Sequence, residues 1–464
     1  MSAPLYDWSA LQLIEAYKAR ELSPVEVIGV VIARIEACEP KLKAMYAFDP
    51  DGAKAQASAS DARWKAGAPK GALDGVPITI KENIATRGVP MPLGTAASDL
   101  TPAASDAPPA ARVREAGAVI LGKTTMPDFG MLSSGLSSFH PLTRNPWNLA
   151  KNPGGSSAGA GAAAAAGYGP LHLGTDIGGS VRLPASWNGI FTLKPSLGRV
   201  PVDPPYIGRV AGPMTRTVGD SALLMSVLSL PDARDHMSLP PADIAWMDLE
   251  RDVKGLKLGL QLDAGFGLPV EAEVRAAVED AAKLFESAGA TIVPMKGFVT
   301  REVFDGLDNF WRARSWADMV KLTPEKRLSI LPFIGAWARK AVNLSAVEVV
   351  RGLGCIMEMR RLATAATQSV DYILSPTAPM PAYAAELPCP TNDSSKPLEH
   401  IGFTVPWNMG EQPASSINCG YTSDGLPIGL QIVGKRFDDI GVLRVSRWYE
   451  RNRPTQLPWP RLTD

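Results

Sequence analysis

Residues 171–184 read LHLGTDIGGSVRLP, and this stretch predicts the turn around which the fold and the site are organised. Its apolar start, residues 171–173, predicts a strand, and residues 181–183 predict the start of a helix. Two glycines stand directly before Ser180, which allows a tight turn whose consecutive backbone N–H groups point to one spot. An oxyanion hole requires this arrangement, so Ser180 is a candidate nucleophile.

A second serine motif, Gly154-Gly155-Ser156-Ser157, lies upstream in a tract of glycine, alanine and serine that spans residues 152–196. The motif is predicted to end a loop and open a helix, whose free N–H groups favour a developing negative charge. A Gly/Ser-rich tract can also be a flexible linker. The apolar segments 171–173 and 190–193 and the helix-forming alanines 162–166 favour an ordered site instead.

A serine hydroxyl needs a base to take its proton. His172 is close to the serine motifs in sequence, but it lies within an apolar strand, as core histidines do. Lys81 ends the apolar run GVPITIK, residues 75–81, where burial would lower its pKa enough to leave it neutral. A lone lysine at a strand end is more typical of a surface position, so the pattern alone leaves the base open.

Outward from these motifs the chain alternates between strands and helices. Residues 8–47 predict two helices, the second beginning at the Ser23-Pro24 pair. Strands are predicted at 73–84, 118–121, 255–262, 290–293, 370–374 and 425–433, and helices at 110–116, 271–288 and 301–369, with a surface excursion at 231–255. This alternation predicts an α/β fold with a central mixed, mostly parallel β-sheet covered by helices on both faces.

Composition narrows the class of protein. Of 464 residues, 47 are Lys or Arg and 47 are Asp or Glu, so the net charge is zero and no global field favours nucleic acid. The 45% apolar and 20% charged content is typical of a globular protein, and we expect no membrane partner. The N-terminal sequence shows no basic n-region followed by an apolar h-region, so we expect a cytoplasmic location. The four cysteines and four histidines lack the spacings of zinc or redox sites, so no metal is expected.

Several stretches together resemble the amidase signature family over nearly the whole chain. They are residues 75–81, 153–157, 173–184, 193–196, 375–377 and 424–431, and the two serines Ser156 and Ser180 have the family's spacing of 24 residues. The resemblance implies one domain over residues 1–464, with an N-terminal helical region (1–70), a catalytic core (71–230) and a variable helical region for the substrate pocket (300–370). It also makes a homodimer possible.

The resemblance assigns roles to individual residues. Lys81 becomes the general base, Ser156 a bridging serine with a cis peptide bond, and Ser180 the nucleophile. The backbone N–H groups of the oxyanion hole would be those of Ile177, Gly178, Gly179 and Ser180, with support from Ser157, Thr175, Asp176 and Arg182. Two positions depart from the family's usual pattern, Ala158 for glycine and Glu82 for aspartate, and neither removes a reacting group.

The implied activity is hydrolysis of a small carboxamide to a carboxylic acid plus ammonia or amine through an acyl-Ser180 intermediate. The implied chemistry needs no metal or organic cofactor. Alternatives are a glutaminase-type subunit of a tRNA-dependent amidotransferase, a hydrolase of carboxylated ureas such as allophanate, and an inactive scaffold. The glutaminase needs an arginine for the glutamine α-carboxylate, and Arg182, Arg209 and Arg312 are candidates.

The predicted substrate pocket is apolar. The resemblance places it between residues 126–140 and 304–359, and Met131, Ser133, Phe139 and Trp311 are its candidate lining residues. Such a pocket fits aryl or medium alkyl amides better than charged ones.

Overall fold

The computed structural model describes residues 4–462, and its N-terminal part is helical. A short 3₁₀ turn, Leu5–Asp7, precedes α1 (Ala10–Ala19), α2 (Pro24–Leu42) and α3 (Pro50–Lys65). Ser9 and Ser23 each close a capping box with the residue three positions on, Gln12 and Glu26, which satisfies backbone N–H groups that the first turn leaves free. The two helices predicted over residues 8–47 are confirmed.

One eleven-stranded sheet forms the centre of the molecule, in the order β1-β3-β2-β4-β6-β5-β10-β11-β9-β7-β8. The strands are β1 (Met45–Tyr46), β2 (Pro77–Lys81), β3 (Val119–Thr124), β4 (Leu171–Asp176), β5 (Phe191–Lys194), β6 (Val210–Thr215), β7 (Lys257–Gln261), β8 (Thr291–Met295), β9 (Tyr372–Pro376), β10 (Ala414–Tyr421) and β11 (Pro427–Val433).

The sheet is mixed, and its parallel pairs lie toward its two sides. β2 runs parallel to both β3 and β4, and β7 runs parallel to both β8 and β9. The strands between these groups, from β4 through β6, β5, β10 and β11 to β9, pair antiparallel. The predicted α/β fold with a central mixed sheet is confirmed, and the antiparallel centre is a feature that the strand and helix pattern did not show.

Helices cover both faces of the sheet. They are α4 (Pro108–Glu115), α5 (Ala158–Ala166), α6 (Arg182–Asn188), α7 (Val218–Leu228), α8 (Ala272–Ser287), α9 (Arg301–Met319), α10 (Pro324–Leu328), α11 (Pro332–Arg339), α12 (Ala346–Ala366), α13 (Val405–Met409) and α14 (Asp439–Asn452), with 3₁₀ turns at Asp128–Gly130 and Lys340–Asn343. Side chains of β3 alternate between the layers, as strand geometry requires. Ile120 packs in the core under α4 and α7, whereas Val119 and Leu121 pack against α2 and α5.

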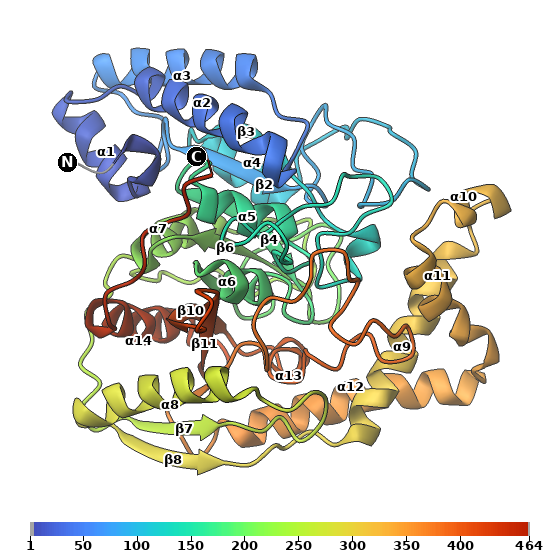
Figure 1. Ribbon diagram of the computed structural model, residues 1–464. Helices are drawn as coiled ribbons and strands as arrows, with labels where there is room; N and C mark the ends of the chain where they lie inside the picture. Colours follow the sequence, from blue (N-terminus) through green and yellow to red (C-terminus); the bar gives the residue numbers. More distant parts are fainter. Residues whose placement is uncertain (1–3, 463–464) are drawn as a thin grey trace.

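Helices α9 to α12 form a separate layer beside the core, seen in yellow and orange in Figure 1 on the opposite side from the N-terminal helices. α9 packs along α12, and Trp311, Trp337 and Met359 are buried between these helices and the loops around α13. The predicted helical stretch 301–369 is therefore confirmed as several helices. No helix among residues 4–462 is long and apolar enough to cross a membrane.

Some elements differ from the sequence predictions. β6, β10, α3, α7 and α14 were not predicted, and β2 begins at Pro77 rather than at residue 73. β6 reads VAGPMT, and its proline and glycine are typical of turns rather than strands. The excursion 231–255 has neither helix nor strand, but it is not simply at the surface, because Trp246 and Val253 are buried in the main core.

Candidate active site

Lys81 ends β2, whose five residues are all buried between β3 and β4. Its Nζ lies 2.8 Å from Ser156 Oγ, 3.0 Å from Ser157 Oγ and 3.0 Å from Thr175 Oγ1. Three hydroxyl groups from two segments, the loop before α5 and the end of β4, therefore surround one amine, and no carboxylate pairs with it among residues 4–462.

Burial lowers the pKa of Lys81 to about 7, because desolvation penalises the charged amine. Asp176 and Glu82 oppose this shift, whereas the positive charge of Arg209 adds to it. A neutral amine has two N–H groups and one lone pair, so one of its three hydroxyl neighbours must donate to Nζ. The arrangement can thus take a proton from a serine hydroxyl near neutral pH.

Two other buried lysines show that burial alone does not mark a base. The pKa values of Lys123 and Lys194 are also lowered to about 7 by desolvation. Lys123 contacts the Ile84 carbonyl and, at 2.7 Å, Thr86 Oγ1, and Lys194 donates to the Pro195 carbonyl at 2.7 Å. What distinguishes Lys81 is its contact with two consecutive serines.

The loop before α5 presents these serines. The Gly155–Ser156 peptide bond is cis, as the family resemblance implied. Gly155 cannot carry a side chain, because a Cβ there would lie 2.4 Å from the Ser134 backbone nitrogen. Ser157 immediately precedes α5, and its N–H donates to the Ser180 carbonyl at 3.1 Å, which joins the two serine motifs directly.

The turn that carries Ser180 connects β4 to α6. Asp176 accepts hydrogen bonds from Gly179 N–H at 2.8 Å and from Val181 N–H at 3.1 Å, which folds the chain back on itself. Within residues 4–462 the N–H groups of Ile177, Gly178 and Ser180 have no protein acceptor. The prediction that Gly179 also offers a free N–H is wrong, because the Asp176 carboxylate takes it. The turn thus offers three free donors.

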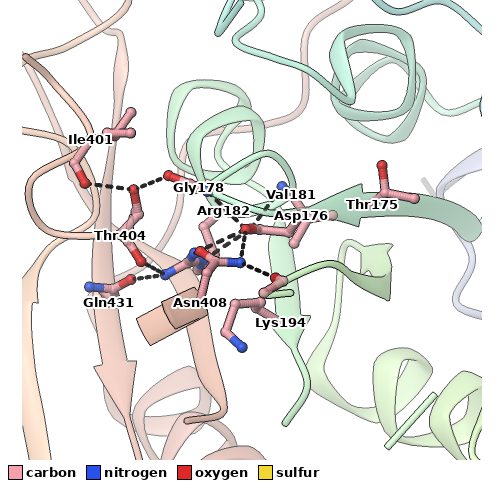
Figure 2. A network of polar contacts seen from close by, with 12 residues as sticks. Thr175, Asp176, Gly178, Val181, Arg182, Lys194, Ile401, Thr404, Asn408 and Gln431 are labelled. Carbon is pink, nitrogen blue, oxygen red and sulfur yellow. Dashed lines mark hydrogen bonds and ion pairs between the residues drawn. The ribbon is translucent and has the colours of Figure 1, made fainter. Parts of the chain in front are cut away.

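A buried polar network holds this turn (Figure 2). Arg182 makes an ion pair with Asp176 at 3.0 Å and donates to the Thr404 carbonyl at 2.9 Å and to Gln431 Oε1 at 2.8 Å. Asn408 donates to Asp176 Oδ1 at 2.8 Å. Burial alone would raise the pKa of Asp176, but the charge and hydrogen bonds of Arg182, the charge of Lys194 and the Val181 N–H together outweigh it and hold this pKa well below its usual range. The predicted support by Asp176 and Arg182 has this geometric basis.

A small cavity opens on the turn. Half-buried Ser180 lines it, as do Met131, Ser133 and Trp311 from the predicted pocket set. Phe139, predicted to join them, does not line this cavity and packs edge-on against Tyr46 and His140 instead. The remaining lining residues are Gly130, Leu132, Ile177, Gly178, Arg314, Leu398 and Ile401.

Comparison with known proteins shows the family of the chain. The Amidase family profile matches residues 26–443, a range that includes Lys81, Ser156 and Ser180. The chain belongs to the amidase signature family. Its members named below hydrolyse or transfer amide groups, and the chain is an amide-hydrolysing enzyme of this family.

Relatives in the amidase signature family cover almost the full chain. A glutamyl-tRNA(Gln) amidotransferase subunit of Myxococcus xanthus is 37% identical over 96% of this chain and 97% of its own. An acylamidase of Rhodococcus erythropolis is 32% identical over 96% and 95%, respectively. The crystal structure of a bacterial aryl acylamidase superposes with a TM-score of 0.89, at 30% identity, over 97% of both chains.

The two departures from the usual pattern of the amidase signature family have clear structural settings. Ala158 is the first residue of α5, where helical backbone accepts a methyl group. Glu82 is buried directly after Lys81 and accepts hydrogen bonds from Gly94 N–H, at 2.9 Å, and from His140 Nε2. The longer side chain therefore ties two loops to the end of β2. Sequence reasoning missed His140, which is 58 positions away from Glu82.

Proposed function

We propose that the chain hydrolyses a small carboxamide to a carboxylic acid plus ammonia or amine through an acyl-Ser180 intermediate. The observation that carries the proposal is the buried Lys81 amine in contact with the hydroxyl groups of Ser156 and Ser157. The backbone N–H of Ser157 in turn donates a hydrogen bond to the Ser180 carbonyl. A neutral lysine beside a serine supplies the base that a second serine needs. The reaction requires no metal or cofactor.

The proposed steps follow from the positions of these groups. Neutral Lys81 takes the proton of Ser156 Oγ while Ser156 takes that of Ser180 Oγ, and Ser180 Oγ bonds to the amide carbonyl carbon. Free N–H groups of the turn, such as those of Ile177 and Gly178, stabilise the resulting oxyanion. The C–N bond then breaks as the relay returns the proton to the leaving nitrogen. Water loses a proton to the same relay and attacks the ester, and the relay returns this proton to Ser180 Oγ as the acid leaves.

The cavity at Ser180 supports a substrate with an apolar group. Trp311, Met131 and Ile401 line it, and the tip of the Trp311 ring lies so close to Gly178 that a Cβ there would be 3.3 Å away. Transfer of an aryl or alkyl group from water to such walls is favourable by about 25 cal/mol per Å² of apolar surface. We therefore favour aryl and medium alkyl amides.

A second candidate function is that of a glutaminase-type component of a tRNA-dependent amidotransferase, favoured by the 37% identity to the Myxococcus xanthus relative over 96% of the chain. That function uses the same acyl-enzyme chemistry on glutamine and passes ammonia to a partner. It requires polar or charged contacts for the glutamine amino and carboxylate groups. The two functions are separated by whether the isolated chain prefers glutamine or apolar amides.

The test measures ammonia release from glutamine and from a panel of aryl and alkyl carboxamides by the isolated chain. The same assay is run on three variants, Ser180→Ala, Lys81→Ala and Ser180→Ala/Lys81→Ala. We expect each variant to lose at least roughly 10³-fold in kcat/KM, and the double variant to lose no more than Ser180→Ala alone, because residues that act as one unit are not additive. The Ser287→Ala variant, an exposed serine on α8, is the matched control.

Each outcome decides between the candidates. Turnover of apolar amides that Ser180→Ala abolishes supports the proposed hydrolase. Turnover confined to glutamine supports the amidotransferase component. Turnover that persists in Ser180→Ala would show that another group is the nucleophile and would refute the acyl-Ser180 intermediate.

A further inference from the structure

Two arginines lie on the wall of the cavity system that leads to Ser180. Arg209 directly precedes β6, and Arg314 lies on α9. Both line a cavity that adjoins the Ser180 cavity, because Arg314 and Met131 line both cavities. Arg209 also lines a third cavity together with Thr175, the residue that contacts Lys81 Nζ. The pair thus lies where the uncleaved part of a bound substrate would extend.

Neither guanidinium has a carboxylate partner within 4.0 Å in the described part of the chain, although both side chains are half-buried. Arg209 Nη1 donates to the Pro204 carbonyl at 3.2 Å, and Arg314 lies over the Tyr206 ring, 4.0 Å from its centroid. These contacts fix the side chains but leave most of their donors free, since a guanidinium has five N–H groups.

The other candidate arginines are committed elsewhere. Arg182 is buried in its ion pair with Asp176, and Arg312 pairs with Asp308 at 2.6 Å. Neither of them lines the Ser180 cavity. Of the three arginines that the sequence offered for binding a carboxylate, Arg209 alone lines the cavity that shares Arg314 and Met131 with the Ser180 cavity.

The surrounding charges do not neutralise the positive charges of Arg209 and Arg314. Burial lowers the pKa of Arg209, and the positive charge of Arg314 lowers it further, so the two guanidiniums repel each other. Two carboxylates, Asp203 and Asp318, line the same cavity, but both residues are exposed, and Asp318 pairs with Lys321 at 2.9 Å. An entering anion would relieve the repulsion and accept charge-assisted hydrogen bonds from both arginines.

We propose that Arg209 and Arg314 form a carboxylate subsite, so that the preferred amide has an apolar body in the Ser180 cavity and a carboxylate between the two guanidiniums. This inference rests on the proposed amide hydrolysis and narrows its substrate class. The carboxylate belongs either to the acyl part, as in a dicarboxylic acid monoamide, or to the amine part, as in an N-acyl amino acid. The recognising chemistry is the same in both cases.

The kinetic test uses two matched substrate pairs. Adipamate and hexanamide differ by a carboxylate on the acyl side, and N-benzoylglycine and N-isobutylbenzamide differ by one on the amine side. We expect the parent enzyme to favour the charged member of one pair by about tenfold or more in kcat/KM, equivalent to roughly 1.4 kcal/mol. The pair that shows this preference identifies the side that carries the carboxylate.

The variants are Arg314→Gln, Arg314→Lys, Arg209→Gln/Arg314→Gln and, as a matched control, Arg351→Gln, an exposed arginine on α12. The ratio of the two kcat/KM values should fall toward one in Arg314→Gln and the double variant, and remain unchanged in Arg351→Gln. Arg314→Lys should keep only part of the preference, because an ammonium lacks the planar fork of guanidinium. A preference that survives in the double variant would overturn the proposal, as would a parent that favours the neutral member of both pairs.

A binding measurement separates this proposal from the proposed function. Calorimetric titration of the Ser180→Ala protein with N-benzoylglycine and adipamate reports the subsite without turnover. Binding that is lost in Ser180→Ala/Arg209→Gln/Arg314→Gln supports the subsite even if no amide is hydrolysed. Hydrolysis of the neutral amides without carboxylate binding would leave the hydrolase in place and exclude the subsite.

Discussion

The surroundings of Lys81 prepare its side-chain amine for proton transfer. An ordinary lysine would be charged at neutral pH, but full burial among hydroxyl groups brings the pKa of Lys81 to about 7. Asp176 pulls this pKa up and Arg209 pushes it down. Burial therefore sets most of this shift, and the surrounding charges adjust it.

We expect kcat/KM to fall by about tenfold for each pH unit below about 7, because only the unprotonated amine of Lys81 can accept the serine proton. Above this pKa the amine is neutral, and the rate reaches a plateau. The measurement is kcat/KM for a neutral amide between pH 5 and pH 9, chosen so that the substrate does not titrate.

Two variants show whether this acid limb belongs to Lys81. Arg209→Gln removes a positive charge that lowers the pKa of Lys81, so its limb should move to higher pH. Lys123→Met removes another buried lysine whose pKa is about 7 but which does not contact either serine, so its limb should stay in place. A limb that moves in Lys123→Met and not in Arg209→Gln would contradict the assignment to Lys81.

At this scale, residues within short motifs were predictable and residues joined across the chain were not. Lys81, Ser156 and Ser180 each stand in a recognisable run of sequence. Glu82 could be named, but its partner His140 could not, because nothing in the local sequence indicates which loop folds back on β2. The free N–H groups of the turn were predicted as four, and only the side-chain position of Asp176 shows that one is taken.

Helix α5 shows why a segment of only glycine and alanine occupies the centre of the molecule. All nine of its residues are buried, and the N–H of Gly159 donates to the Thr125 carbonyl at 3.1 Å. A Cβ at Gly159 would lie 2.2 Å from the Ala44 carbonyl oxygen and 2.5 Å from the Thr125 nitrogen. Small side chains let α5 approach the backbone of its neighbours and so carry the serine loop to Lys81.

The same substitution should therefore have opposite effects on two helices. Gly159→Ala places a methyl group against backbone that cannot move aside, and we expect it to lower the free energy of unfolding by about 1–3 kcal/mol. Gly29→Ala on α2 meets nothing within 4 Å and should raise it by about 0.5–1 kcal/mol, because alanine loses less conformational entropy in a helix. Urea unfolding of the two variants measures both changes, and equal effects would contradict the close packing of α5.

The turn between β4 and α6 depends on elements that lie far along the chain. Thr404, which directly precedes α13, donates to the Gly178 carbonyl, and Asn408 of α13 donates to Asp176. Gln431 of β11 accepts a hydrogen bond from Arg182. Their positions are more than 220 residues from the turn, so no periodicity or motif spacing could have joined them to it. The sequence therefore predicts the turn and its supporting residues Asp176 and Arg182. The structure adds their distant partners on α13 and β11.

In the molecule as a whole, one sheet joins two groups of parallel strands through an antiparallel centre. The parallel pairs follow the strand, helix, strand pattern that the sequence shows around residues 73–121 and 255–293. β6 and β10 complete the centre, and both were missed because glycine and proline interrupt β6 and polar residues fill β10. The candidate site lies beside this centre, where β2, β4 and the loop before α5 meet.

The last described residues of the chain pack against the first 3₁₀ turn and α2. Arg461 donates to Tyr6 Oη at 2.8 Å and to Asp7 at 2.9 Å, and Arg34 donates to the Pro460 carbonyl at 3.1 Å. The guanidinium of Arg216 lies 4.3 Å from the centre of the Trp459 ring. The C-terminal segment thus holds the first 3₁₀ turn in place through these contacts.

Deletion of residues 459–464 should lower the free energy of unfolding by about 2–4 kcal/mol, since each lost hydrogen bond to a charged group contributes roughly 1.5–3 kcal/mol and other contacts partly replace it. Amidase activity at 25 °C should be retained, because none of these contacts involves Lys81 or the serines. The control is Arg451→Gln, which removes an exposed ion pair with Glu250 and should change stability by less than about 1 kcal/mol. Urea unfolding measures the three proteins. A deletion no more destabilising than Arg451→Gln would mean that the contacts of residues 459–461 with the N-terminal part of the chain do not contribute to the free energy of unfolding.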